Sequence, residues 1–148
     1  MKPLFTIIIA LGLYGSVWAQ AVNVDDSKIA LQGYSPVSYL DLGLAQLGKK
    51  AYKSDHEGLH YYFTSAEQKA SFDANPKKYL PQYGGFCAFG IYAGAKFRVD
   101  PHKFLVRNGK LYLFLYDLEV DAKQLWIEGN EAELLKKANT NWTKLGKG

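Results

Sequence analysis

The strongest constraint on the fold is the dipeptide Asn108-Gly109, which lies between two apolar segments. Asn-Gly is typical of a two-residue type I′ turn, in which both central residues adopt a positive φ. It predicts a hairpin formed by residues 104–107 and 110–116. Apolar or aromatic side chains alternate on both faces of the second strand, with Leu111, Leu113 and Leu115 on one face and Tyr112, Phe114 and Tyr116 on the other. We therefore expect a central strand that is covered on both faces.

A second hairpin is expected over residues 50–63, with its turn at His56-Glu57-Gly58 and strand-favouring aromatic residues after the turn. Ser65 and Gln68 then form a capping box, in which the Ser65 hydroxyl accepts the Gln68 N–H and the Gln68 side chain reaches back. This pattern predicts a helix that ends near Ala74.

Shorter helices are expected where a capping residue or a proline precedes a helix-favouring segment, namely at Pro36, Asn75-Pro76, Asp121 and Asn130. The last of them carries an apolar stripe of Leu134, Leu135, Ala138 and Trp142. We find no internal repeat, linker or low-complexity tract. Together these hairpins and helices predict an α+β fold, with a small antiparallel sheet of hairpins and several short helices packed over it.

Residues 1–20 have the pattern of a secretory signal peptide, with Lys2, an apolar run and small residues at the cleavage positions. Cleavage is expected after Ala19 or Ala21. The apolar run is shorter than a membrane span, which needs ~20 residues to cross ~30 Å of hydrocarbon. The alternative is an uncleaved N-terminal anchor. We expect a single mature domain over residues 21–148, exported to the periplasm or secreted, without a transmembrane segment.

Charge and motifs narrow the functional classes. The chain has 18 basic and 14 acidic residues and a net charge of +4, dispersed along the sequence, which does not indicate nucleic-acid binding. The sequence contains no G-x-S-x-G elbow, phosphate-binding loop, dinucleotide fingerprint or H-E-x-x-H helix. We therefore expect a binding module rather than an enzyme.

Several segments together resemble exported YHS-domain proteins: residues 33–39 (GYSPVSY), residues 61–67 (YYFTSAE), residues 81–88 (PQYGGFCA) and residues 108–113 (NGKLYL). The likeness runs in order along almost the whole mature chain. It implies a YHS-like fold and metal binding or handling. In the metal-associated cytosolic members two cysteines occupy the central stretch, and Thr64 and Gln68 stand at those positions here. The resemblance therefore implies no thiolate clamp at that place.

Cys87 is the single cysteine, so an internal disulfide is excluded even in an oxidising compartment. It follows Gly84-Gly85, and its thiol is expected to be buried, bound to a metal, reactive, or paired with a cysteine of another chain. His60 or His56 could complete a site for copper or zinc with Cys87 if the first hairpin lies beneath the glycine loop. Three functions stay open: a metal-binding module, a metal-free domain that binds a protein partner or is purely structural, and a cysteine-dependent redox protein or enzyme.

Overall fold

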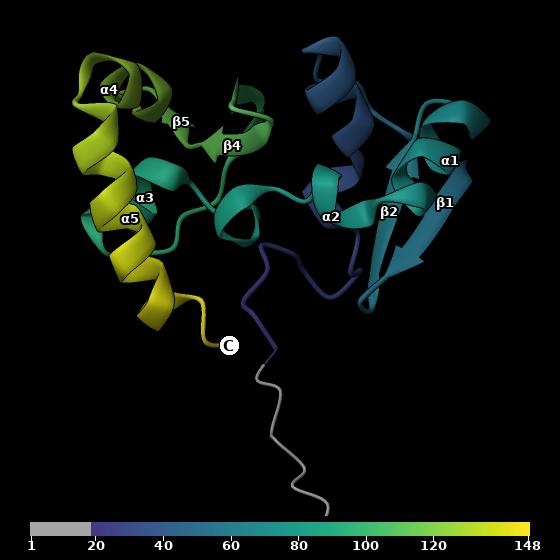
Figure 1. The fold of residues 1–148 in the computed structure, drawn as a ribbon, viewed down its shortest axis with the longest axis horizontal. Coiled ribbons are helices and arrows are strands. Elements are labelled where there is room, and N and C mark those ends of the chain that lie inside the picture. The colour runs from purple at the N-terminus through teal and green to yellow at the C-terminus, as the bar shows by residue number, and fades with distance from the viewer. Residues whose placement is uncertain (1–18) are drawn as a thin grey trace, which may run out of the picture.

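The structure is a computed structural model that describes residues 19–148, so most of the predicted signal peptide lies outside the described residues. Figure 1 shows the N-terminal half of the described chain on one side of the molecule and the C-terminal half on the other. The elements of the first half are η1 (Ala30–Gly33), η2 (Ser38–Leu42), β1 (Lys49–His56), β2 (Leu59–Phe63), α1 (Ala66–Ala74) and α2 (Pro76–Tyr79). Those of the second half are η3 (Gln82–Gly85), α3 (Ala88–Ala93), β3 (Asp100–Arg107), β4 (Lys110–Phe114), β5 (Tyr116–Asp117), β6 (Val120–Asp121), α4 (Ala122–Glu128) and α5 (Glu131–Leu145).

The predicted α+β fold is confirmed, with antiparallel pairs β1–β2, β3–β4 and β5–β6. Asn108 and Gly109 have φ angles of 52° and 69°, as the type I′ turn requires. Residues 111–114 are all buried, which confirms that β4 is covered on both faces. The strand is shorter than predicted, because it ends at Phe114 and Tyr116 belongs to β5. On its second edge β4 forms only isolated bridges with Pro81 and Cys87, so it is not the centre of a larger sheet.

The cap predictions hold in part. The Ser65 hydroxyl accepts the Gln68 N–H at 3.2 Å, and α1 ends at Ala74 as expected. The Gln68 side chain does not close the box on Ser65. It accepts instead the Thr64 N–H at 3.2 Å and the Ser35 hydroxyl at 2.7 Å, so it joins α1 to the chain before η2. Asn75 makes no side-chain cap bond, and α2 begins with Pro76, whose φ already suits a helix.

The C-terminal helices begin where the sequence predicts. The side chains of Asp121 and Asn130 accept the N–H of the third residue after each of them, at 3.1 Å and 3.3 Å. Leu134 and Ala138 are buried on the inner face of α5, and α3 lies against this helix. Among residues 19–148 no helix is long and apolar enough to span a membrane.

A backbone unit at residues 29–63 recurs at residues 81–114, which corrects the expectation of no internal repeat. Each half opens with consecutive residues of positive φ, residues 31–33 in η1 and residues 83–85 in η3. A short helix and a hairpin follow in both halves. Each half also has an isolated parallel β-bridge at the corresponding place. Ile29 pairs with His60 in the first half, and Pro81 pairs with Leu111 in the second.

The two main hairpins also share an irregularity. Pairing jumps from Lys49–Phe63 to Lys53–Tyr62 in the first and from Asp100–Phe114 to Phe104–Leu113 in the second. Every pair of the first hairpin has a counterpart at the same spacing in the second. Side chains agree at only a few structural positions, among them Gly33 and Gly85, Gly58 and Gly109, Tyr61 and Tyr112, and Phe63 and Phe114. The remaining side chains face different neighbours, which hides the repeat in the sequence.

Each half has its own hydrophobic cluster. The smaller cluster lies between the β1–β2 hairpin and helices α1 and α2, and it contains Ala30, Val37, Tyr61, Phe63, Phe72 and Tyr79. The larger cluster surrounds β4, α3 and the inner faces of α4 and α5, with Trp126, Ile91 and Leu113 among its buried members. Leu31 and Tyr39 belong to the first half by sequence and pack in the larger cluster, so they tie the halves together.

Candidate functional site

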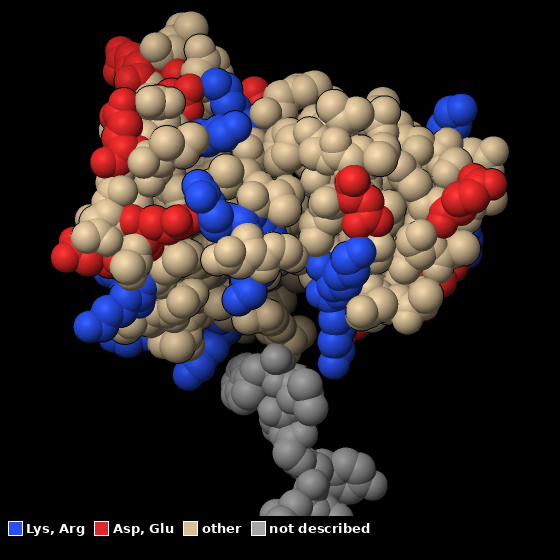
Figure 2. Space-filling model, turned by 45° about the horizontal axis from the view of Figure 1, so that its top comes forward, with Lys and Arg blue, Asp and Glu red and all other residues tan. Residues whose placement is uncertain are grey.

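A cleft of about 740 Å³ lies where the two halves meet. Leu31 and Gln32 of η1 line it from the first half, and Tyr83, Gly84 and Gly85 of η3 line it from the second. The surface shown in Figure 2 is hollowed between the two halves, and basic and acidic side chains are both spread over this face. A volume of this size lies within the range of ~300–1,000 Å³ that is typical of small-molecule sites.

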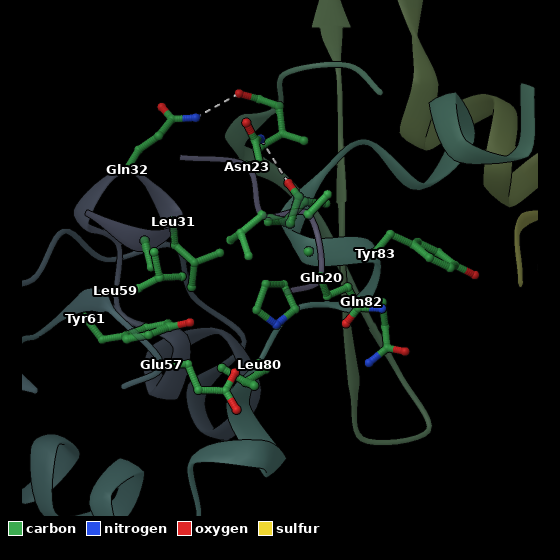
Figure 3. A pocket seen from close by; sticks show the side chains of 18 of the residues that line it. Gln20, Asn23, Leu31, Gln32, Glu57, Leu59, Tyr61, Leu80, Gln82 and Tyr83 are labelled. Carbon is green, nitrogen blue, oxygen red and sulfur yellow. Dashed lines mark hydrogen bonds between the residues drawn. The ribbon is translucent and has the colours of Figure 1, made fainter. Parts of the chain in front are cut away.

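Apolar side chains make up most of the wall. Figure 3 shows Leu31, Leu59 and Leu80 grouped on the side of the first half, with Gln82 and Tyr83 across the cavity. The remaining apolar lining includes Val22, Ala30, Pro81, Val99, Pro101, Leu113 and the ring of Trp142. A ligand that fills the cleft would therefore bury mainly carbon surface, which contributes roughly 25 cal/mol per Å².

Residues 19–23, which span the two predicted cleavage positions, form one wall of the cleft. The Ala21 N–H donates to the Gly146 carbonyl at 2.8 Å, and the Asn23 N–H donates to the Gly84 carbonyl at 2.8 Å. The Asn23 side-chain amide also donates to the Gly85 carbonyl at 3.1 Å. A Cβ atom on Gly84 would lie 2.1 Å from the Ala21 carbonyl oxygen, so only glycine allows this approach.

Several polar groups in the cleft are already satisfied by the protein. The Gln32 amide donates to the Val99 carbonyl at 3.1 Å, and the Tyr39 hydroxyl donates to the Pro101 carbonyl at 2.7 Å. The Tyr83 hydroxyl donates to the Asn139 side chain at 2.9 Å. These bonds hold the walls in place and leave their groups less free to bind a ligand.

Tyr61 and Glu57 differ from those groups. Tyr61 is 4% exposed as a residue, its hydroxyl oxygen reaches the cavity surface, and no residue from 19 to 148 hydrogen-bonds to it. Figure 3 shows this hydroxyl directed into the cavity, with the Glu57 carboxylate on the same side. Burial, together with the negative charge of Glu57, raises the pKa of Tyr61 to about 12. The hydroxyl is therefore neutral and able both to donate and to accept.

Cys87 is buried and caps the N-terminus of α3. Its side chain is 1% exposed, it precedes α3, and its Sγ accepts the Gly90 N–H at 3.4 Å. Burial raises the pKa of the thiol, although nearby backbone N–H groups partly oppose that shift. A reactive thiolate needs the opposite shift, so the geometry gives no support to the cysteine-dependent redox alternative. Cys87 is not among the residues that line the cleft.

His56 and His60 both belong to strands of the first hairpin. His60 Nδ1 lies 2.5 Å from an Asp55 carboxylate oxygen, while the His56 ring packs against Tyr61 and Phe72. Within residues 19–148 no group of three or more His, Cys, Asp or Glu side chains could hold a metal ion. The copper or zinc site on Cys87 with His60 or His56 stays a prediction, and the geometry adds nothing to it.

The Gln68 side chain has a structural role in the contact between α1 and η2. The Gln68 amide donates to the Ser38 hydroxyl at 2.9 Å, and its oxygen accepts the Ser35 hydroxyl. The Ser38 hydroxyl in turn lies 2.8 Å from the Gln46 side-chain oxygen. This buried network joins α1 to η2 by neutral hydrogen bonds.

The cleft was not predicted from the sequence. From the sequence, Tyr61 is a strand-favouring residue and Glu57 is part of a turn, and neither pattern indicates a cavity. The available signal was the repeated pattern of a glycine turn followed by Tyr-x-Phe at residues 58–63 and 109–114. No protein-family model matches the chain, and neither does any curated protein or solved structure.

Proposed function

We propose that the mature chain is an exported binding module that holds a small, mainly apolar molecule in the cleft between its two halves. The signal-peptide pattern of residues 1–20 supports export. The binding proposal rests on the cleft itself. Its walls include residues from the two left-handed turns, residues 31–33 in η1 and residues 83–85 in η3. Few of its polar groups are left without a protein partner, which favours an apolar ligand with one polar end.

The proposal is tested by ligand-induced thermal stabilisation, because a molecule that binds only the folded chain raises the melting temperature. We expect some members of a set of small aromatic and aliphatic compounds to stabilise the protein. Leu59→Trp fills the cleft with a larger side chain and should abolish that stabilisation. Leu118→Trp is the matched control, because Leu118 is 97% exposed and lies away from the cleft lining.

Two results would contradict the proposal. In one, no compound stabilises the wild-type protein at concentrations up to solubility. In the other, Leu59→Trp folds normally and responds to the same compounds as Leu118→Trp does, which would place their binding outside the cleft.

A further inference from the structure

We infer that the molecule bound in the cleft carries a single positively charged amine on an apolar body, with the amine held by Glu57 and Tyr61. This inference rests on the proposed binding function and narrows it to a class of ligand. Two polar groups of the cleft, the Glu57 carboxylate and the Tyr61 hydroxyl, are available to a ligand, and the first of them is negatively charged.

Glu57 is the one charged residue among the described residues that line the cleft. Its carboxylate is 71% exposed and lies 3.9 Å from His56 Nε2, beyond hydrogen-bond distance. A carboxylate only accepts hydrogen bonds, so its natural ligand partner is a donor, and a cationic donor above all. The chain as a whole has more basic than acidic residues, so the negative charge in the cleft does not follow from the overall composition.

Tyr61 adds a second polar group at the same end. Its hydroxyl is free, points into the cavity beside Glu57 and can accept one N–H of an ammonium group. The other polar side chains of the described lining are neutral, and those of Gln32, Tyr39 and Tyr83 already bond to other residues of the protein. The charge of a ligand would therefore be recognised at the Glu57 end, while Leu31, Leu59 and Leu80 contact its apolar body.

The same arrangement disfavours acids. At the Glu57 end of the cleft a carboxylate or phosphate would be repelled by the Glu57 carboxylate, and no basic side chain is found among the described lining residues. Because Glu57 is largely exposed, solvent screens the interaction, and the expected preference is moderate. We expect about a fivefold to tenfold advantage for the amine over a neutral ligand of the same shape.

The experiment is a calorimetric titration with 4-phenylbutylamine, 4-phenylbutanol and 4-phenylbutyrate, which share an apolar body and differ in the charge of the head group. The amine should bind most tightly and the acid most weakly. In Glu57→Gln the amine should fall to the affinity of the alcohol, while the affinity of the alcohol stays unchanged. Tyr61→Phe should also weaken the amine. Glu119→Gln, which removes an exposed carboxylate away from the cleft, should change nothing.

The outcomes separate the two proposals. If all three probes bind with equal affinity, or if Glu57→Gln leaves the advantage of the amine intact, the amine inference is wrong and the binding function stands. If the acid binds most tightly, the inference is also wrong. If none of the three binds while other compounds stabilise the wild-type protein, the amine inference is wrong and the binding function stands. If no compound of either set binds, the proposed function fails as well.

Discussion

Ser35 and Cys87 occupy equivalent positions in the two halves of the molecule. The Ser35 hydroxyl accepts the Ser38 N–H at 3.3 Å, and the Cys87 Sγ accepts the Gly90 N–H at 3.4 Å. Each residue follows a turn of positive φ and comes before a short helix. The repeat thus explains the single cysteine as a buried cap, because the other half uses serine for the same bond.

The cap role predicts how substitutions at Cys87 affect stability. Cys87→Ala removes the acceptor of the Gly90 N–H and should lower the free energy of unfolding by about 1–2 kcal/mol. Cys87→Ser keeps an acceptor, as Ser35 does in the first half, and should cost less than about 1 kcal/mol. Urea unfolding of both variants measures the difference. A serine variant less stable than the alanine variant would contradict the cap role.

Metal content tests the earlier prediction of a copper or zinc site. Untagged protein and Cys87→Ser are equilibrated with copper or zinc, desalted and analysed for bound metal. Since the thiol is buried and holds its proton, we expect equal amounts of metal in the two proteins. A loss of about one metal ion per chain in the variant would establish Cys87 as a ligand. His60→Gln and His56→Gln would then identify its partner.

Gly84 should be far less tolerant of alanine than Gly43 is. Both have positive φ, 59° and 67°, so both variants incur left-handed strain of about 1–2 kcal/mol. Only Gly84 has the Ala21 carbonyl in the place of a Cβ, whereas nothing lies within 4 Å at Gly43. We expect Gly84→Ala to lose an additional ~1–3 kcal/mol. It should also make the N-terminal segment up to Asn23 accessible to protease, and equal losses in both variants would show that this segment does not pack on the turn.

Alkaline pH should destabilise the protein. Burial raises the pKa of the Tyr39 and Tyr83 hydroxyls, and that of Tyr61 reaches about 12. An unfolded chain releases these protons near pH 10, while the folded chain keeps them. Because the unfolded state then binds fewer protons, the free energy of unfolding falls as the pH rises from about 10 to 12. Urea midpoints across this range measure the slope, and Tyr61→Phe should reduce it. An unchanged slope would show that Tyr61 ionises freely.

The sequence predicts local structure well where a residue type acts through its own backbone or cap. Asn108-Gly109 sets the hairpin register, and the Ser65, Asp121 and Asn130 side chains accept helical N–H groups as expected. The left-handed turns escaped prediction, because Leu31, Gln32 and Tyr83 are not residues that favour positive φ by themselves. Tertiary packing imposes that conformation. The cleft escaped prediction for the same reason, since contacts between distant segments create it.

The central claim is that both halves of the chain contact one bound molecule. Backbone amide chemical shifts, followed by NMR during a titration with 4-phenylbutylamine, test it most directly. We expect perturbed amides at residues 31–33 and 57–61 of the first half and at residues 83–85 of the second, with no change at Leu118. Shifts confined to one half, or to the outer surface of α4 and α5, would contradict the claim.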